Sequence, residues 1–266
     1  MKYQEIKPGP SASRFVKCYW VLEDDTRDTH PQTIVPDGRS EVIINLGRPF
    51  QQESAGDWHA QPEIFFVGQI TGPMVIRPQG PARTIGIRFH PHGAIRLLQV
   101  PMFELTDSAV SLDDVSQSLH RKLDQLRDMT SLNEQLAALE RIILAEMIEG
   151  DEDQLISVAV SKFEQANGLI GIRQLADWLG LSSRHLERRF RNEVGISPKL
   201  FSRMQRFQSV FHRMEDPATS WVDTAVSSGY YDQAHLIRDF REFAGTTPNS
   251  LLVEEFDLMR HFAGPH

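Results

Sequence analysis

The stretch Gly229–Pro248, GYYDQAHLIRDFREFAGTTP, decides the fold of the C-terminal part of this chain. It is the second copy of a pattern that starts about 50 residues earlier. Six positions recur, with Ala176, Gly180, Leu186, Phe190, Gly195 and Pro198 matched by Ala225, Gly229, Leu236, Phe240, Gly245 and Pro248. The first two pairs are 49 residues apart and the other four are 50 apart. The duplication therefore predicts a repeated structural unit with one extra residue in the second turn.

Each copy has the parts of two helices joined by a tight turn. In the first copy, residues 172–179 are predicted to form a short helix that Gly180 ends in a left-handed conformation. Ser182 is a predicted N-cap for a second helix over residues 183–194, which Gly195 ends. In the second copy Asp232 takes the place of the capping serine. Both copies are therefore predicted to be helix-turn-helix units.

The second helix of each unit has one apolar face and one polar face. Leu186 and Phe190 are four residues apart and are expected to point inward. Arg184, Glu187 and Arg188 lie on the opposite face at spacings i, i+3 and i+4, so they can enter a major groove together. The sequence predicts that this face of the first unit is charged. The corresponding face of the second unit mixes polar, apolar and charged side chains: Gln233, Ala234, Ile237 and Arg238.

A single helix over residues 199–214 is predicted between the two units. Its apolar side chains recur at helical spacing: Phe201, Met204, Phe207, Val210 and Phe211. About 16 residues make a rod of about 24 Å at 1.5 Å per residue. Such a rod can hold two reading helices in successive major grooves, which are about 34 Å apart on one face of a duplex.

Residues 160–255 resemble the DNA-binding domain of the AraC/XylS family of transcriptional regulators, whose signature matches the second copy and its exit. The resemblance implies base-facing positions on both reading helices. Ala234 and Ile237 cannot form hydrogen bonds with base edges. The second reading helix is therefore expected either to contact methyl groups of bases or to contribute mainly through phosphate contacts. The DNA-contact candidates are Ser183, Arg184, Glu187, Arg188, Arg191, Gln233, Ala234, Ile237, Arg238 and Arg241.

Charge supports a local DNA-binding surface. The whole chain has a formal net charge of −8. Residues 171–252, in contrast, carry 11 Lys and Arg against nine Asp and Glu, while residues 1–150 carry 15 against 20. Four arginines fall within two turns of the first reading helix, as phosphate contacts require: Arg184, Arg188, Arg189 and Arg191.

Composition also limits the cell compartment and the chemistry. The 266 residues with 40% hydrophobic content favour two domains, which we expect at residues 1–150 and 151–266. No apolar run of 18 residues or secretory signal pattern is found, so we expect a cytoplasmic protein with no membrane partner. Cys18, the single cysteine, excludes an internal disulfide and a zinc site built from several cysteines.

The first 90 residues show short alternating runs separated by Pro, Gly and Asp, which is typical of β-structure. Strands are expected at residues 15–22, 41–46, 63–67, 74–77 and 83–89. These strands favour a small antiparallel barrel or sandwich. The predicted fold class is therefore α+β, with an N-terminal barrel or sandwich carrying helices and an all-α C-terminal part.

Helices are expected after the strands at residues 92–98, 112–126, 132–147 and 154–165, with an acidic linker at 150–153. The helix over 132–147 has an apolar stripe of Leu132, Leu136, Leu139, Ile143 and Met147. Packing against the chain's own β-domain explains this stripe, and a homodimer interface through Leu132–Met147 is the alternative.

The N-terminal half resembles, more weakly, the cupin-like sensor domains of the same family, which bind a small effector. Residues 36–45 match the second cupin motif, although Glu41 stands where a metal-binding cupin has histidine. His90 and His92 match the paired histidines of the first motif, but its glutamate is missing, so we expect no metal and no cofactor. Five charged or polar residues form either a structural network or an effector pocket: Asp37, Arg39, Glu41, Arg88 and His90.

The sequence is compatible with three hypotheses for the function. The leading hypothesis is a sequence-specific, effector-responsive transcriptional regulator that binds double-stranded DNA. The resemblance also implies RNA polymerase and a small-molecule effector as partners. The second hypothesis is an enzyme, either a cupin-type metalloenzyme or a DNA-repair transferase, but no nucleophile and base arrangement is visible and we expect no enzymatic activity. The third is a duplicated helical module that binds protein.

Overall fold

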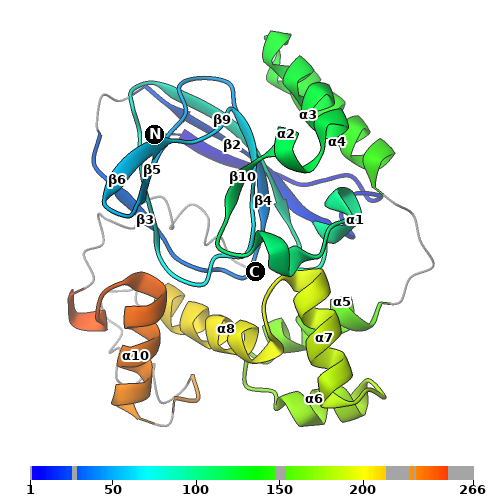
Figure 1. The fold of residues 1–266 in the computed structure, drawn as a ribbon, viewed down its shortest axis with the longest axis vertical. Helices are drawn as coiled ribbons and strands as arrows, with labels where there is room; N and C mark the ends of the chain where they lie inside the picture. The colour runs from blue at the N-terminus through cyan, green and yellow to red at the C-terminus, as the bar shows by residue number, and fades with distance from the viewer. Residues whose placement is uncertain (1, 26–28, 148–153, 214–227, 231, 251–266) are drawn as a thin grey trace.

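A β-rich N-terminal half and a helical C-terminal half make up the chain in a computed structural model (Figure 1). The structure describes residues 2–25, 29–147, 154–213, 228–230 and 232–250. The predicted α+β fold class is confirmed. The expected linker at 150–153 and Ala225 of the second repeat lie outside the described residues. Within the described ranges, no helix combines the length and apolar composition that crossing a bilayer requires.

Two antiparallel sheets form the N-terminal half, and neither closes into a barrel within the described residues. The larger sheet contains, in spatial order, β1 (Lys2–Ile6), β2 (Val16–Asp24), β9 (Ala82–Phe89), β4 (Glu41–Asn45), β7 (Ile64–Val67) and β10 (Ala109–Ser111). The smaller contains β3 (Gln32–Ile34), β8 (Met74–Arg77), β5 (Gln51–Ser54) and β6 (Asp57–Ala60). Of the two predicted alternatives, the open arrangement corresponds to the sandwich.

The larger sheet buries both of its faces, and alternation along β9 separates them. Ile85, Ile87 and Phe89 enter a core that the N-terminal helices cover. Thr84 and Arg88 point to the other side, where they line a cavity between the sheets. Because side chains alternate along a strand, one eight-residue strand supplies both a helix-packed core and a cavity wall.

Short helices cover the first face. They are α1 (Ile95–Leu98), η1 (Met102–Leu105), α2 (Leu112–Val115), α3 (Gln117–Asp124), η2 (Gln125–Asp128) and α4 (Leu132–Glu146). The prediction of one helix over 112–126 is wrong, because Ser116 has φ −154° and ψ 94° and its side chain accepts from the Leu119 N–H. Ser116 therefore starts a new helix, since an extended residue with a capping hydroxyl interrupts helical pairing.

The apolar stripe on α4 packs within the same chain. Leu139, Ile143 and Met147 are buried in the core under the larger sheet, and Leu132 and Leu136 pack against that core. Leu144, which lies outside the stripe, is 39% exposed. Packing against the chain's own β-domain therefore accounts for all five residues of the stripe.

The described part of the C-terminal half contains six helical elements. They are α5 (Leu155–Gln165), α6 (Ile172–Trp178), α7 (Ser183–Val194), α8 (Pro198–Arg213), α10 (Gln233–Ala244) and η3 (Pro248–Ser250). All lie within one or two residues of the predicted ranges where a range was predicted. Phe163, Phe190 and Phe201 meet edge-on or tilted in the core, with ring centroids 5.4 to 5.9 Å apart.

The sequence repeat is also a repeat of backbone conformation. Gly180 and Gly229 have φ of 68° and 76°, and Gly195 and Gly245 have φ of 103° and 70°. These left-handed values favour glycine because it has no Cβ atom. The helix-turn-helix punctuation predicted from the recurring glycines is thus present in both copies.

Candidate nucleic-acid interface and cavity

Helix α7 is fixed at its N-terminus and along its inner face. The Ser182 hydroxyl accepts a hydrogen bond from the His185 N–H at 3.2 Å, as the predicted cap requires. Leu186 and Phe190 are fully buried in the C-terminal core. With the cap and the inner face both fixed, the rotation of α7 about its own axis is determined, and its other face is turned outward.

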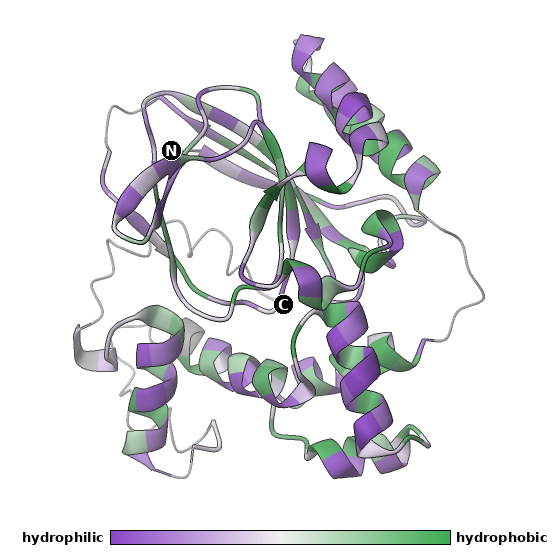
Figure 2. Ribbon diagram, viewed as in Figure 1, coloured by the Kyte–Doolittle hydropathy of each residue, from purple (hydrophilic) through white to green (hydrophobic). Residues whose placement is uncertain are grey.

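The outward face of α7 carries the side chains predicted for DNA contact. Ser183, Arg184, Glu187, Arg188 and Arg191 are all exposed. Figure 2 shows α7 as mainly hydrophilic. Arg189 is instead directed along the helix, where it donates to Glu193 at 2.8 Å, so it is less available to a phosphate than its neighbours.

A groove runs along this face and ends at the N-terminal half. Arg184, Glu187, Arg188 and Arg191 line it together with Phe103 of η1. Phe103 is 44% exposed, and the Arg191 guanidinium lies 6.0 Å from its ring centroid. No local pattern in the sequence points to Phe103, because it lies far from α7 along the chain.

Helix α10 presents the second outward face in the same way. The Asp232 carboxylate accepts from the His235 N–H at 2.7 Å, which is the same cap as in α7 with an acidic residue. Gln233, Ala234, Arg238 and Arg241 are exposed. Ile237 is half-buried, so its side chain belongs partly to the core.

An ion-pair network fixes α10 to α8. Arg203 of α8 donates at 2.6 Å both to Asp239, which is fully buried, and to Glu242. Tyr230 donates to the other oxygen of Asp239 at 3.1 Å. Burial alone would lower the pKa of Arg203, and the Glu242 and Asp239 carboxylates raise it above its usual value. Arg203 therefore stays charged, and the buried carboxylate is compensated.

Helices α7 and α10, the two predicted reading helices, are held at opposite ends of α8 (Figure 1). Helix α8 contacts both α7 and α10. Its inner face buries Phe201, Met204, Phe207 and Val210, as the helical spacing predicted. The arrangement is a spacer helix with one outward-facing reading helix near each end.

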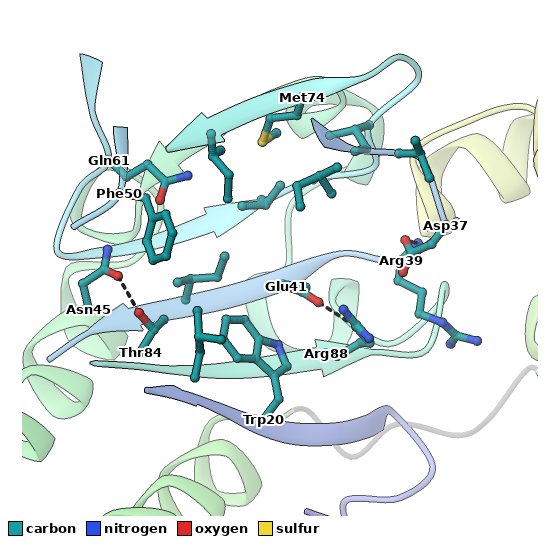
Figure 3. Close-up of a pocket in the computed structure, with 18 residues that line it drawn as sticks. Trp20, Asp37, Arg39, Glu41, Asn45, Phe50, Gln61, Met74, Thr84 and Arg88 are labelled. Atoms are coloured by element: carbon teal, nitrogen blue, oxygen red, sulfur yellow. Dashed lines mark hydrogen bonds and ion pairs between the residues drawn. The ribbon is translucent and has the colours of Figure 1, made fainter. Parts of the chain in front are cut away.

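A separate cavity of about 100 Å³ lies between the two sheets (Figure 3). An engineered cavity of about 150 Å³ in another protein holds benzene, so this space suits a group of about one ring. Ten apolar side chains line it: Trp20, Leu22, Ile34, Val35, Ile43, Phe50, Val67, Ile70, Met74 and Ile76. Polar side chains also line it, and among them are Asp37, Arg39, Glu41 and Arg88 of the predicted set.

One end of this cavity contains an ion pair. Arg88 donates to Glu41 at 2.6 Å, and Glu5 lies 3.5 Å from the same guanidinium. Burial raises the pKa of Glu41, and Arg88 opposes that effect. Burial lowers the pKa of Arg88, while Glu41 and Asp37 raise it by more, so Arg88 remains charged. A compensated pair therefore closes the cavity at this end.

His90 does not line the cavity. Strand β9 ends at Phe89, and the His90 N–H donates to the Phe15 carbonyl at 2.8 Å, so the alternation that placed it beside Arg88 no longer applies. Its ring stacks on His92, with centroids 6.0 Å apart. Burial lowers the pKa of each imidazole to about 4. Both histidines are therefore neutral near pH 7.

The described residues show no metal site or activated thiol. No group of three or more His, Cys, Asp and Glu side chains in these residues is placed to hold a metal ion. Cys18 is buried in β2, and burial raises its thiol pKa to about 12. A thiol with this pKa is protonated at neutral pH and is a poor nucleophile.

Residues 35–39, here called the linking segment, touch both the cavity and the C-terminal half. Val35, Asp37 and Arg39 line the cavity. Val35 also belongs to the C-terminal core, the Pro36 carbonyl accepts from Gln208 of α8 at 2.5 Å, and Arg39 lies 3.3 Å from Glu164 of α5. The linking segment is thus part of the cavity wall and also part of the contact surface with the C-terminal helices.

Residues 68–73, here called the bridging loop, form a second such part of the cavity wall. Gly68 and Ile70 line the cavity. A Cβ atom on Gly195, the C-cap of α7, would lie 3.3 Å from Gln69, and one on Gly245, the C-cap of α10, would lie 3.4 Å from Pro73. Gln69 also donates to the Gly38 carbonyl at 2.8 Å. The loop therefore contacts both reading helices and the linking segment.

Two protein families match parts of the sequence. A family described as a helix-turn-helix domain matches residues 175–252, and a domain of unknown function (DUF6597) matches residues 4–111. The C-terminal segment is a helix-turn-helix domain of the AraC type. No curated protein sequence matches the chain.

Three solved structures to which the chain is similar have TM-scores below 0.5. A single-residue variant of apo ToxT from Vibrio cholerae has a TM-score of 0.46 at 9% identity, covering 92% of this chain and 97% of that one. Another ToxT structure from Vibrio cholerae has a TM-score of 0.45 at 9% identity, covering 99% of each chain. The AraC-like transcriptional activator CuxR has a TM-score of 0.27 at 14% identity, with 82% and 87% covered.

Proposed function

We propose that this chain, whose C-terminal segment is an AraC-type helix-turn-helix domain, is a sequence-specific transcriptional regulator that binds double-stranded DNA. The observation that carries the proposal is the repeated pair of capped helices, each with a buried inner face and an exposed polar outer face. The division into an N-terminal domain over 1–150 and a DNA-binding domain over 151–266 belongs to the same proposal.

In this proposal α7 and α10 enter successive major grooves. Arg184, Glu187 and Arg188 contact base edges from α7, because charged and polar groups at these spacings face a groove together. Arg191 and Arg241 lie nearer the C-terminal ends of the two helices and contact phosphates. Gln233 and Arg238 read bases from α10, while Ala234 and the half-buried Ile237 contact thymine methyl groups.

We also propose that a small molecule in the cavity between the sheets controls DNA binding. The linking segment and the bridging loop support this, because each lines the cavity on one side and touches the C-terminal helices on the other. A ligand that displaces the linking segment changes contacts with α5 and α8, and one that displaces the bridging loop changes contacts with both reading helices. Allosteric coupling of this kind is typically worth about 1 to 3 kcal/mol, or roughly 5- to 150-fold in affinity.

The test is selection of bound duplexes from a random pool, followed by titration of the selected site. Arg188→Ala should relax the preference at one base pair, because a bidentate arginine to guanine contributes about 1 to 3 kcal/mol. The salt dependence of binding should change little, since a base contact releases few phosphate counterions.

Arg141→Ala is the matched control, because Arg141 is an exposed arginine on α4, in the helical cover of the larger sheet. This variant should select the same sites as the unmodified chain. If Arg188→Ala also selected an unchanged set of sites with unchanged affinity, α7 would not be a reading helix.

A further inference from the structure

The cavity between the sheets has apolar walls and one charged end. Its walls are mainly apolar, and Trp20 brings an aromatic surface to them. Charged side chains gather at one end, where Figure 3 shows the Asp37 carboxylate near Glu41 and Arg88. The ligand that fits such a space has an apolar body and one polar group.

The charge at that end is unbalanced toward carboxylates. Glu41 and Glu5 both lie against the single Arg88 guanidinium, at 2.6 and 3.5 Å. Asp37 adds a third carboxylate. One of its oxygens accepts from the Arg39 backbone N–H at 2.9 Å, and it forms no ion pair with any residue that the structure describes. Among the residues that line the cavity, Arg88 therefore has two carboxylates beside it, Asp37 and Glu41, while Glu5 approaches it from outside the lining.

Arg39 does not restore the balance inside the cavity. Its side chain extends away from the other lining residues in Figure 3 and lies 3.3 Å from Glu164 of α5. One nitrogen of its guanidinium, Nη1, is buried and forms no hydrogen bond with the described residues. That nitrogen would favour an anion, so an anionic ligand is the competing outcome.

We propose that the cavity binds a small aromatic or alicyclic compound with a protonated amine, whose ammonium group pairs with Asp37. The amine supplies the positive charge that this end lacks, and its ring lies between the apolar walls. A carboxylate ligand would instead lie beside Asp37 and Glu41, where like charges in a water-poor space repel. Trp20 adds to the preference, because an aromatic face attracts a cation.

This inference deepens the proposed effector site but is tested without DNA. The full-length chain is mixed in turn with benzylamine, benzyl alcohol and benzoate, which share a ring and differ in charge. Binding is measured at pH 7 by the shift in thermal unfolding temperature and by ligand-observed NMR. Benzylamine should raise the unfolding temperature, benzyl alcohol should raise it less, and benzoate should leave it unchanged.

Asp37→Asn keeps the side-chain oxygen that accepts from Arg39 and removes only the charge, so it should fold. It should weaken benzylamine binding by about tenfold, the usual effect of losing a hydrogen bond to a charged group. Asp57→Asn, on the exposed strand β6, makes the same charge change outside the cavity and should bind benzylamine normally.

Three results would overturn the proposal. They are benzoate binding as tightly as benzylamine, Asp37→Asn binding benzylamine as tightly as the unmodified chain, and no probe binding at all. Duplex binding is measured separately on the same samples. A chain that binds benzylamine but no DNA would refute the regulator and leave this inference intact, and the reverse result would refute only this inference.

Discussion

Gly86 makes room for the Trp20 indole, which lies directly over it and lines the cavity between the sheets. A Cβ atom on Gly86 would lie 1.9 Å from Cε2 of Trp20, far inside van der Waals contact. The two residues are paired across β2 and β9. A side chain of any size at position 86 therefore pushes the indole out of its place in the wall.

Gly86→Ala should lower the free energy of unfolding by about 1 to 3 kcal/mol, the usual cost of overpacking a core. It should also abolish the benzylamine-induced shift in unfolding temperature. Urea titration of a double-mutant cycle with Trp20→Phe checks the cause. The smaller ring should make Gly86→Ala less costly, and equal costs in the two backgrounds would show that the indole is not the obstacle.

His90 and His92 give the chain a predictable dependence on pH. Their pKa values are lowered by burial to about 4, against about 6.5 in an unfolded chain. Between these values the unfolded state binds more protons than the folded state. The contribution of these two neutral histidines to the free energy of unfolding should therefore be fully present above pH 6.5. It should be lost as the pH falls toward 4, with a slope of up to about 1.4 kcal/mol per pH unit for each histidine.

The measurement is urea unfolding at several pH values for the unmodified chain and for the double variant His90→Gln/His92→Gln. The double variant should show a smaller loss of stability between pH 6.5 and 4. Glu41, whose raised pKa acts in the opposite direction, is present in both proteins and cancels in the comparison. Parallel curves for the two proteins would mean that these histidines are not buried in neutral form.

At the scale of single elements, the C-terminal turn of α7 has two structural roles. Gly195 ends the helix with φ of 103°, and it also lies against the N-terminal half. The Thr106 hydroxyl donates to the Gly195 carbonyl at 2.9 Å, and a Cβ atom at this position would lie 3.1 Å from the same hydroxyl. Gly180, which ends α6, has φ of 68° and no atom within 4 Å of its Cβ position.

Alanine at these two glycines separates backbone strain from contact between the halves. Gly180→Ala should cost roughly 1 kcal/mol, because it adds only left-handed strain. Gly195→Ala should cost about 1 kcal/mol more, since Thr106 and the Met102 carbonyl must also move. Chemical denaturation of both variants checks this difference. Equal losses would indicate that the contact with Thr106 contributes nothing.

The elements that sequence predicted best are those whose causes are local. Ser182, Gly195 and Asp232 mark helix ends within a few residues of themselves, and each has the predicted role. Ser116 carries the same kind of signal, and the break that it causes could have been predicted from the sequence. His90 was grouped with Arg88 by alternation, which fails because the strand ends one residue before it.

Contacts between distant parts of the chain had no comparable signal. Thr106 and Gly195 are 89 positions apart, and nothing in either neighbourhood of the sequence indicates that they meet. The same holds for Gln208 and the Pro36 carbonyl, which are 172 positions apart. Four members of the predicted effector set do share one cavity. Glu41 and Arg88 meet there because they are paired across β4 and β9, and Asp37 and Arg39 reach it from the linking segment, which the strand pattern did not predict.

At the scale of the whole molecule, Gln69 connects the two halves. It is 2% exposed, donates to Gly38 of the linking segment at 2.8 Å, and lies against Gly195 of α7. Asp107 fixes the same loop by accepting from the Thr71 N–H at 2.6 Å. In the proposed regulation, this firmly held loop is the route by which a change in the cavity walls would reach α7 and α10.

Gln69→Met keeps the size of the side chain but removes its hydrogen bond to Gly38, so it should separate ligand binding from the DNA response. Benzylamine should still bind within about twofold, because Gln69 does not line the cavity. The change in duplex affinity that benzylamine causes should be lost. Coupling requires a structural element whose conformation depends on both the cavity and the DNA-binding helices, and this variant disconnects that element from the linking segment. Fluorescence titration of a selected duplex, with and without benzylamine, measures this change. Gln4→Met, at an exposed position of β1, is the control and should respond like the unmodified chain. If Gln69→Met retained the full response, the linking segment alone would have to transmit the signal.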